Sequence, residues 1–233
     1  MSAKDRKAAL ADHLRQAVLT CELAPGQDMD EVALCDAFGL SRTPVREVFR
    51  ELDGEGYLDL REGRGVRVAE MSHTTLRDFF IAAPMVYGAV LRLAARNGLP
   101  HQIARLKTAQ EDYRNALRNG SAADRTLANN RFHLITGEMA ANTYLLPSFH
   151  RLLIDHARIG MTFYQPVSNQ MASNVSASAD QHDQMIAAIE ARDEQKAAEL
   201  ADAHWALSRE EIERFVMPPA LDVPLGTYTT KAS

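Results

Sequence analysis

A nine-residue segment near the N-terminus, Gly39-Leu-Ser-Arg-Thr-Pro-Val-Arg-Glu47, constrains the fold of this chain more than any other feature. Its Thr43-Pro44 step predicts a helix start, because threonine can cap a helix and proline is preset for the first helical position. Apolar residues then recur at helical spacing from Val45 to Leu52, and two glycines end the pattern. The segment therefore predicts a tight turn followed by a helix whose apolar face packs on neighbouring helices.

The sequence on either side completes a small domain. An amphipathic helix is predicted over 8–19, and a second helix from Asp30 to about Phe38, with Gly39 as its C-terminal stop. Residues 57–60 and 66–68 alternate as two strands around the turn Gly63-Arg64-Gly65. Three helices closed by a β-hairpin make a winged helix-turn-helix, which we expect over residues 1–70.

Arginines mark one surface of this predicted domain. Arg42, Arg46 and Arg50 are spaced by four residues, so they form one cationic ridge away from the apolar face of their helix. Such a helix fits the DNA major groove, and arginine forks match guanine edges and phosphates. The net charge of this region argues against DNA binding, since residues 1–70 contain ten Lys and Arg against fourteen Asp and Glu. DNA binding therefore depends on local sorting of charge and not on bulk positive charge.

Only helical patterns follow residues 71–72, which we assign to a linker. We expect a mainly α fold, with an all-helical bundle over residues 73–216 and a C-terminal tail over 217–233. The expected helices of the bundle span 74–96, 101–118, 123–140, 144–163, 177–191 and 194–215. Pro84 should kink the first of them, and residues 165–176 should interrupt the helical pattern before the fifth.

The sequence also restricts the cellular compartment. It has no run of eighteen apolar residues and no apolar signal core near the N-terminus, so we expect no membrane partner. Cys21 and Cys35 both lie in apolar-patterned surroundings, which is typical of a reduced, cytoplasmic protein.

Histidines of the predicted bundle form a candidate metal site. His133 has Asn129 one turn before it on the same helix face, and His182 begins an apolar period and therefore points inward. His204 lies on the inner stripe of the last helix. Three imidazoles and one amide oxygen, drawn from three helices, are a donor set that can hold a divalent ion inside a bundle.

A second interpretation of these histidines stays open. A histidine on an apolar face is more often an ordinary core residue than a metal ligand. His150 and His156 are further candidates, but six residues apart they face different sides of their helix.

These features together resemble one family of bacterial regulators. The segments Pro25-Gly26, Ser41-Arg-Thr-Pro-Val-Arg-Glu47, Gly56-Tyr57 and Gly63-Arg-Gly65 are similar to the winged helix of the GntR family. The helical remainder resembles the metal-binding, FCD-type effector domain of the FadR branch of that family, and the likeness covers residues 8–215. It implies contacts with operator bases and phosphates from Arg42, Thr43 and Arg46, and with the minor groove from Gly63 and Arg64. The arginine ridge adds Arg50 as a further predicted DNA contact. Val32 stands where the family often has an arginine, so we expect that contact to be missing.

The resemblance also implies a metal-ligand set of Asp-x-x-x-His followed by two histidines twenty-two residues apart. His182 and His204 match that separation, and His133 follows Asn129, which stands where aspartate is usual. Asparagine offers one carbonyl oxygen and no charge, so we expect weaker binding of the ion. Zinc is the expected metal, with nickel or manganese as alternatives.

The effector would bind beside that metal, as a carboxylate or a similar oxygen ligand. Ala83 and Tyr87 stand where such domains often have Arg and Glu, so an anion anchor is missing and a phenol is gained. Arg158 is a candidate replacement, although a surface or dimer-interface position would explain it equally well. Met85 and Tyr87 together resemble a subgroup that regulates aromatic-acid catabolism.

From these patterns we expect a homodimeric, ligand-responsive repressor of a catabolic operon that binds a palindromic DNA operator. The rival interpretation is a helical metallohydrolase with an N-terminal winged-helix interaction module, because three histidines with an open position can activate water. That rival lacks an evident general base and an HExxH signature. A third interpretation is a sensor without metal, whose histidines line an organic pocket.

Overall fold

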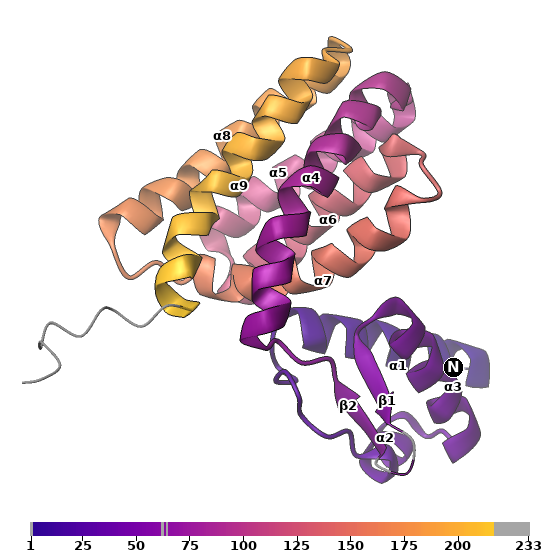
Figure 1. Cartoon of the computed structure of the whole chain (residues 1–233). Coiled ribbons are helices and arrows are strands. Elements are labelled where there is room, and N and C mark those ends of the chain that lie inside the picture. The colour runs from indigo at the N-terminus through magenta and orange to yellow at the C-terminus, as the bar shows by residue number, and fades with distance from the viewer. Residues whose placement is uncertain (1, 62, 64, 217–233) are drawn as a thin grey trace, which may run out of the picture.

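A computed structural model describes residues 2–61, 63 and 65–216, which form a small N-terminal unit and a larger helical bundle (Figure 1). The N-terminal unit contains α1 (Ala3–Leu19), α2 (Glu31–Phe38), α3 (Arg42–Glu55), β1 (Leu58–Arg61) and β2 (Gly65–Val68). The bundle contains α4 (His73–Asn97), α5 (Pro100–Asn119), α6 (Ala122–Ala140), α7 (Leu145–Phe163), α8 (Asn169–Glu190) and α9 (Glu194–Val216). This architecture confirms the prediction of a winged helix-turn-helix followed by an all-α domain. The expected tail over 217–233 lies outside the described residues.

Local capping explains the geometry of the N-terminal unit. Asp30 caps α2 by accepting hydrogen bonds from two backbone N–H groups, and Gly39 ends that helix in the left-handed conformation at φ 60°. β1 and β2 pair antiparallel, as the sequence predicts. Residues 27–29 add backbone hydrogen bonds to β2, a pairing that the sequence pattern did not indicate.

Two helices of this unit begin earlier than predicted. α1 begins at Ala3, because Ser2 and Asp5 form a reciprocal capping box there. α3 begins at Arg42 with Ser41 in the cap position, so Thr43 lies inside the first turn and is not the cap. The proline that follows Thr43 still fits, because the N–H groups of the first turn have no acceptor within the helix.

The prediction that α8 begins at residue 177 was wrong. The helix begins at Asn169, about two turns earlier, and Ser168 caps it by accepting a hydrogen bond from the Met171 N–H. Met171 and Val175 are buried and continue the apolar stripe of the helix toward its N-terminus. The small and polar residues between them predicted an interruption, but most of them lie on the exposed face.

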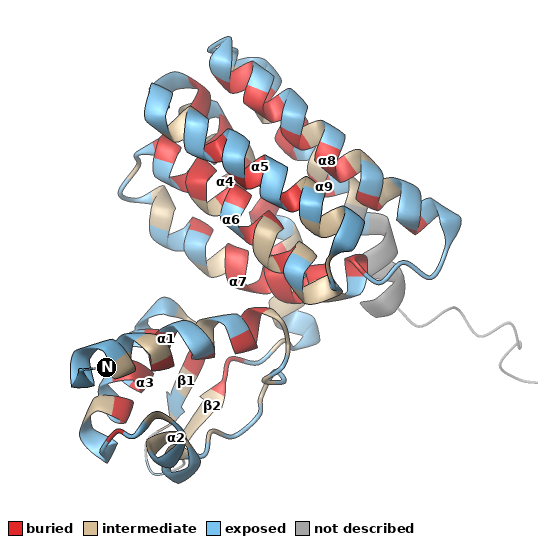
Figure 2. Cartoon of the chain, turned by 180° about the vertical axis from the view of Figure 1, so that it is seen from behind, coloured by how far each residue is buried: buried red, intermediate tan, exposed pale blue. Residues whose placement is uncertain are grey.

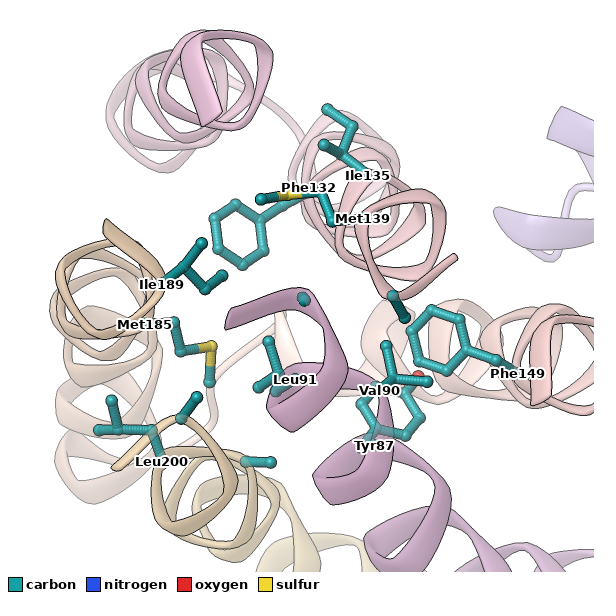
Figure 3. Packing of buried hydrophobic residues seen from close by; sticks show 14 of the residues in the cluster. Tyr87, Val90, Leu91, Phe132, Ile135, Met139, Phe149, Met185, Ile189 and Leu200 are labelled. Carbon is teal, nitrogen blue, oxygen red and sulfur yellow. The ribbon is translucent and has the colours of Figure 1, made fainter. Parts of the chain in front are cut away.

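Helix α4 runs through the centre of the bundle. It continues without a break across Pro84. Among the described helices it is the one long and apolar enough to cross a membrane, and 39% of its most apolar window is buried inside the bundle. Side chains from α6, α7, α8 and α9 pack around it in the core. Figure 3 labels ten residues of this core: Tyr87, Val90, Leu91, Phe132, Ile135, Met139, Phe149, Met185, Ile189 and Leu200.

The two units pack against each other through α7, which lies directly against α1 (Figure 2). Ile154 and Ala157 of α7 belong to the apolar core of the N-terminal unit. Gly56, at φ 90°, approaches α7 so closely that a Cβ on it would lie 2.5 Å from the Cδ of Arg151. The structure therefore joins the winged helix to the bundle through a packed face and not only through a linker.

Candidate DNA interface and metal centre

Helix α3 separates apolar from cationic side chains. Its inner face buries Val45, Val48, Phe49 and Leu52. Its outer face exposes Arg42, Thr43, Arg46 and Arg50, all of them predicted DNA contacts. The four-residue spacing of the arginines thus produces an outward ridge, because residues four apart lie on the same side of a helix.

Ion pairs hold several carboxylates of α3 on a side of the helix away from this ridge. Lys7 and Arg15 of α1 pair with Glu47, Glu51 and Glu55 of α3, at distances from 2.5 to 2.7 Å. These carboxylates lie on the side of α3 that faces α1. Three of the carboxylates of α3 are therefore paired inside the unit, away from the arginine ridge.

One carboxylate does reach the ridge. Glu31 of α2 lies 2.9 Å from Nε of Arg46 and 3.6 Å from Nε of Arg42. Both arginine side chains are more than half exposed, at 56% and 68%, so water screens these pairs and they contribute little to stability. Phosphate groups of DNA can therefore take the place of this glutamate.

A groove of about 460 Å³ lies between α3 and the hairpin, lined by Arg46, Arg50 and Arg61 among others. Gly63 is exposed at the tip of the hairpin, with φ 69°, a backbone conformation that favours glycine. Arg64, the other predicted wing contact, lies outside the described residues. Val32 is 54% exposed, so the position without the usual arginine is at the surface.

The structure brings the three predicted metal-binding histidines together. His133 of α6, His182 of α8 and His204 of α9 each offer a ligand nitrogen within 4.8 Å of the others. Nε2 of His133 and of His182 is buried and has no hydrogen-bond partner among the described residues, and the same holds for Oδ1 of Asn129. Buried polar atoms are normally paired, so convergent acceptors without donors fit a bound cation.

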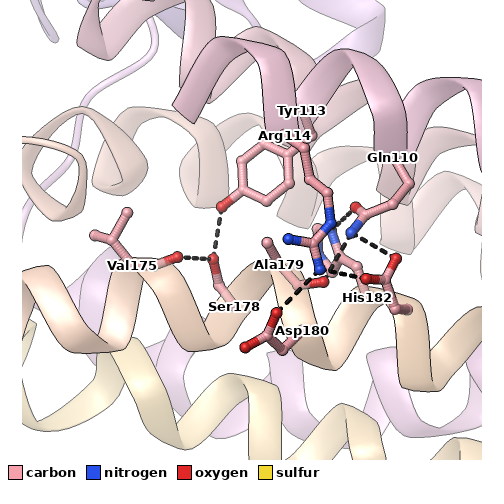
Figure 4. A network of polar contacts seen from close by, with 9 residues as sticks. Gln110, Tyr113, Arg114, Val175, Ser178, Ala179, Asp180 and His182 are labelled. Carbon is pink, nitrogen blue, oxygen red and sulfur yellow. Dashed lines mark hydrogen bonds and ion pairs between the residues drawn. The ribbon is translucent and has the colours of Figure 1, made fainter. Parts of the chain in front are cut away.

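Hydrogen bonds behind the histidines set their tautomers. Nδ1 of His182 lies 3.1 Å from Oε1 of Gln110, and Nδ1 of His204 lies 3.0 Å from Oε1 of Gln181. An amide oxygen only accepts, so each Nδ1 carries the proton and each Nε2 keeps a lone pair for a metal. The orientation of Gln110 is itself fixed, because its Nε2 donates to the backbone oxygen of Ala179 (Figure 4).

Burial keeps these rings in the form that binds metal. Desolvation lowers the pKa of His133 and of His182 well below the usual value, and it lowers the pKa of His204 to about 3. Neighbouring histidines lower these pKa values further, because two cationic rings would repel each other. The imidazoles are therefore neutral at pH 7, as metal ligation requires.

A fourth histidine, which the sequence analysis did not assign to the site, joins this cluster. His156 of α7 has its ring 5.0 Å from that of His133, and its Nδ1 lies 2.7 Å from the hydroxyl of Tyr87. Burial lowers the pKa of His156 to about 4. The signal was present in the sequence, because Phe149, His156 and Gly160 lie on the same inward stripe of α7.

Two small cavities adjoin the histidines. One has a volume of about 20 Å³, room for about one water molecule, and its lining includes Asn129, His156 and His204. The other is about 10 Å³ and is lined partly by Tyr87 and His133. The predicted effector residue Tyr87 therefore lies at the metal-binding cluster.

The second predicted effector residue, Arg158, lines neither cavity. It is 2% exposed, donates to the backbone oxygen of Ala69 at 2.5 Å and pairs with Asp155 at 3.1 Å. Two positions along a helix correspond to a rotation of about 200°, so Arg158 and His156 point in opposite directions. Arg158 is neither a surface residue nor part of the cluster, and it holds the two units together.

Comparison with known protein families decides what kind of protein this is. Residues 6–68 match the family model described as bacterial regulatory proteins, gntR family, and residues 85–207 match the FCD domain. The chain belongs to the GntR family. It is a DNA-binding transcription regulator with an FCD effector domain, and the metallohydrolase interpretation was wrong because this family consists of regulators.

Individual relatives of this GntR regulator agree with that assignment. It is 28% identical over 181 residues to "Probable D-xylose utilization operon transcriptional repressor" of Paenarthrobacter nicotinovorans, covering 78% of this chain and 77% of that one. It is 28% identical over 127 residues to the HTH-type transcriptional repressor RspR of Escherichia coli (strain K12), covering 54% and 56%. The solved structure of E. coli McbR/YncC has a TM-score of 0.72 at 18% identity, over 91% of this chain and 100% of that one, which supports the fold.

Proposed function

We propose that this GntR regulator is a cytoplasmic, homodimeric repressor whose affinity for DNA is set by a small metabolite bound beside a divalent metal ion. The observation that carries the proposal is the convergence of His133, His182 and His204, with Asn129 beside them, as buried groups whose acceptor atoms are free for a cation. Zinc suits three imidazoles best, and nickel or manganese are alternatives. The bound ion would supply an electrophilic centre for an oxygen ligand.

The DNA-binding part of the proposal rests on the outward face of α3. Arg42, Thr43, Arg46 and Arg50 are exposed there, and Gly63 is exposed at the tip of the hairpin. Such a helix reads the major groove while a wing reaches the neighbouring minor groove. A dimer would then bind a palindromic operator, and the names of two relatives support a repressor role.

The outer face of α4 supports dimer formation through the FCD domain. Ile81 and Met85 are 61% and 66% exposed, and an open groove beside them is lined by Pro84, Gly88 and Leu93. An exposed apolar surface of this kind marks a protein–protein contact more often than a free surface. A second copy of the chain is the occupant that the operator model requires.

Helix α7 supports a route from the metabolite to the DNA. Its His156 lines the cavities of the metal cluster, whereas Ile154 and Ala157 pack in the core of the winged helix. A ligand that prefers one position of α7 would therefore also favour one position of the winged helix. An aromatic acid, which the sequence resemblance suggested, would need a cavity much larger than about 20 Å³ and hence a movement of this helix.

The test is metal analysis of the purified full chain combined with DNA binding. We expect about one divalent ion per chain, lost in His133→Ala and in His182→Ala. His150→Ala is the matched control, because His150 lies on α7 with an exposed side chain. The metal part fails if both cluster variants keep the ion, and the regulatory part fails if the wild-type protein ignores DNA upstream of its own gene at modest salt.

A further inference from the structure

We propose that His156, held by Tyr87, is the residue that selects the effector, by donating a hydrogen bond to one oxygen of a small monocarboxylate. This inference rests on the metal site of the proposed function and names the class of ligand that site would take. Three observations carry it: the partner of the Tyr87 hydroxyl, the position of the His156 ring, and the composition of the cavity wall.

The hydroxyl of Tyr87 determines the tautomer of His156. Tyr87 is 4% exposed, and its hydroxyl has one hydrogen-bond partner among the described residues, Nδ1 of His156 at 2.7 Å. If Nδ1 carried the ring proton, the buried phenol hydrogen would have no acceptor. Tyr87 therefore donates to Nδ1, and the proton of the ring lies on Nε2.

The position of His156 places this donor among acceptors. His156 lines both cavities together with His204, and its ring is 5.0 Å from that of His133. The ligand histidines offer lone pairs on Nε2 here, and Asn129 offers one on Oδ1, while the indole of Trp205 lines the smaller cavity. Lone pairs suit a cation, whereas the Nε2–H of His156 suits an anion. A carboxylate satisfies both, because one oxygen can face the cation and the other can accept from His156.

The cavity wall limits the rest of the ligand. The larger cavity is lined by Asn129, His156, Ile159, Gly160, Phe163, Tyr164, Ser178, His204 and Leu207. Among the described residues, this wall contains no lysine or arginine, so a second carboxylate would be buried without a partner. Its apolar residues favour an apolar substituent, and its volume of about 20 Å³ favours a short one, because the wall must move further for every atom added. The geometry points to monocarboxylates with a small apolar group, and against dicarboxylates.

The experiment uses the full chain loaded with Co²⁺, whose visible absorption reports on the surroundings of the ion. Acetate is the probe, malonate the dicarboxylate comparison and acetamide the uncharged one. Tyr87→Phe removes the hydroxyl that fixes the tautomer of His156. His156→Leu removes the hydrogen-bond donor, whereas His156→Gln keeps an amide that can still donate. Tyr57→Phe in the N-terminal unit and His150→Gln on α7 are the matched controls.

Acetate should change the spectrum of the wild-type protein and bind more tightly than malonate or acetamide. Its affinity should fall about ten-fold or more in Tyr87→Phe and His156→Leu, the loss expected for a hydrogen bond to a charged acceptor. His156→Gln should keep part of the affinity, and all variants should bind cobalt at the wild-type stoichiometry.

Three results would overturn the assignment. Cobalt lost from His156→Leu would make His156 a metal ligand and not a donor. Acetate affinity unchanged in Tyr87→Phe and His156→Leu would remove both residues from recognition, and tighter binding of malonate would exclude the monocarboxylate class. Cobalt absent from the wild-type protein is a different result, because it refutes the proposed metal site on which this inference rests.

Discussion

At the scale of single residues, the metal site depends on how strongly Asn129 acts as a ligand. Its Oδ1 is buried without a partner among the described residues, one turn before His133. A neutral amide oxygen stabilises a cation less than a carboxylate does, because it brings no opposite charge into a region of low dielectric. Asn129, which departs from the family pattern, is therefore expected to set the affinity of the site for the divalent ion.

The variant Asn129→Asp should bind the divalent ion about ten-fold more tightly or better, since it adds a charge next to three imidazoles. A competitive chelator titration measures this affinity. Asn130→Asp is the control, because it also adds a buried carboxylate but from a face about 100° away on α6. Weaker binding in Asn129→Asp would show that residue 129 is not a ligand.

Substitutions of Arg46 and of Glu31 should change the affinity for DNA in opposite directions. Arg46→Ala should weaken operator binding about ten-fold or more and flatten sequence preference. Glu31→Gln should tighten binding to any DNA, because the carboxylate that holds Arg46 at 2.9 Å is lost. Fluorescence anisotropy with operator and scrambled duplexes at two salt concentrations measures both, with Glu51→Gln, on the side facing α1, as control. Equal affinities for wild type and Arg46→Ala would remove this arginine from the interface.

At the scale of elements, α7 packs in the cores of both the bundle and the N-terminal unit. It buries residues toward both units, and the buried Arg158 is paired with Asp155 and with the Ala69 backbone. Desolvation raises the pKa of Asp155 and lowers that of Arg158, while each partner opposes the shift of the other. Removing one member of this pair would leave the other buried and unpaired.

Gly56 allows α3 to approach α7, and we predict that Gly56→Ala destabilises the protein by about 1–3 kcal/mol. The reasons are the φ of 90° and the Arg151 Cδ only 2.5 Å from the new Cβ. Thermal or urea unfolding measures the effect. Gly54→Ala, in the same helix with nothing within 4 Å of its Cβ, should instead stabilise by about 0.5–1 kcal/mol. A neutral Gly56→Ala would mean that residue 56 does not hold this left-handed conformation beside Arg151.

At the scale of the whole molecule, the buried histidines make stability depend on pH. In the native state the pKa of His156 is about 4 and that of His204 about 3, against an unfolded value of about 6.5. Below about pH 6.5 the unfolded chain therefore binds protons that the native chain does not. By linkage, the free energy of unfolding decreases as pH falls through this window.

Chelator-treated protein should accordingly lose stability between about pH 6.5 and 5, before most carboxylates titrate. Urea midpoints at several pH values measure this slope. His133→Gln should show a shallower slope, because it removes one buried histidine whose pKa is depressed. A stability that stays flat or rises on acidification over this window would contradict burial of neutral imidazoles.

The formation of a dimer is also a property of the whole molecule. Met85→Glu should shift the protein toward the monomer in sedimentation velocity and weaken operator binding, because a charge would replace a 66% exposed apolar side chain on α4. Tyr144→Glu is the control, since Tyr144 is 92% exposed at the start of α7. A dimer that survives Met85→Glu would place the contact on another face.

Much of the fold could be read from local patterns, because the signals that set α2 and α3 are short in sequence. Asp30, Gly39 and the apolar period of α3 act within a few residues of one another, so the sequence predicted those elements closely. The start of α8 was missed because Met171 and Val175 stabilise that helix only by packing inside the bundle. Residues 27–29 were missed for a similar reason, since their pairing with β2 joins segments far apart in the chain.

The sequence by itself determined which helix faces carry arginines and which carry histidines, since both follow from the period of 3.6 residues per turn. The same period puts His156 on the inward stripe of α7 and Arg158 on the opposite side, but it could not determine that the His156 ring reaches the histidine cluster or that Arg158 binds the Ala69 backbone. Those facts depend on how helices distant in sequence pack together. Only the tertiary structure fixes that packing, because it is decided by side-chain contacts summed over the whole core and not by any local pattern.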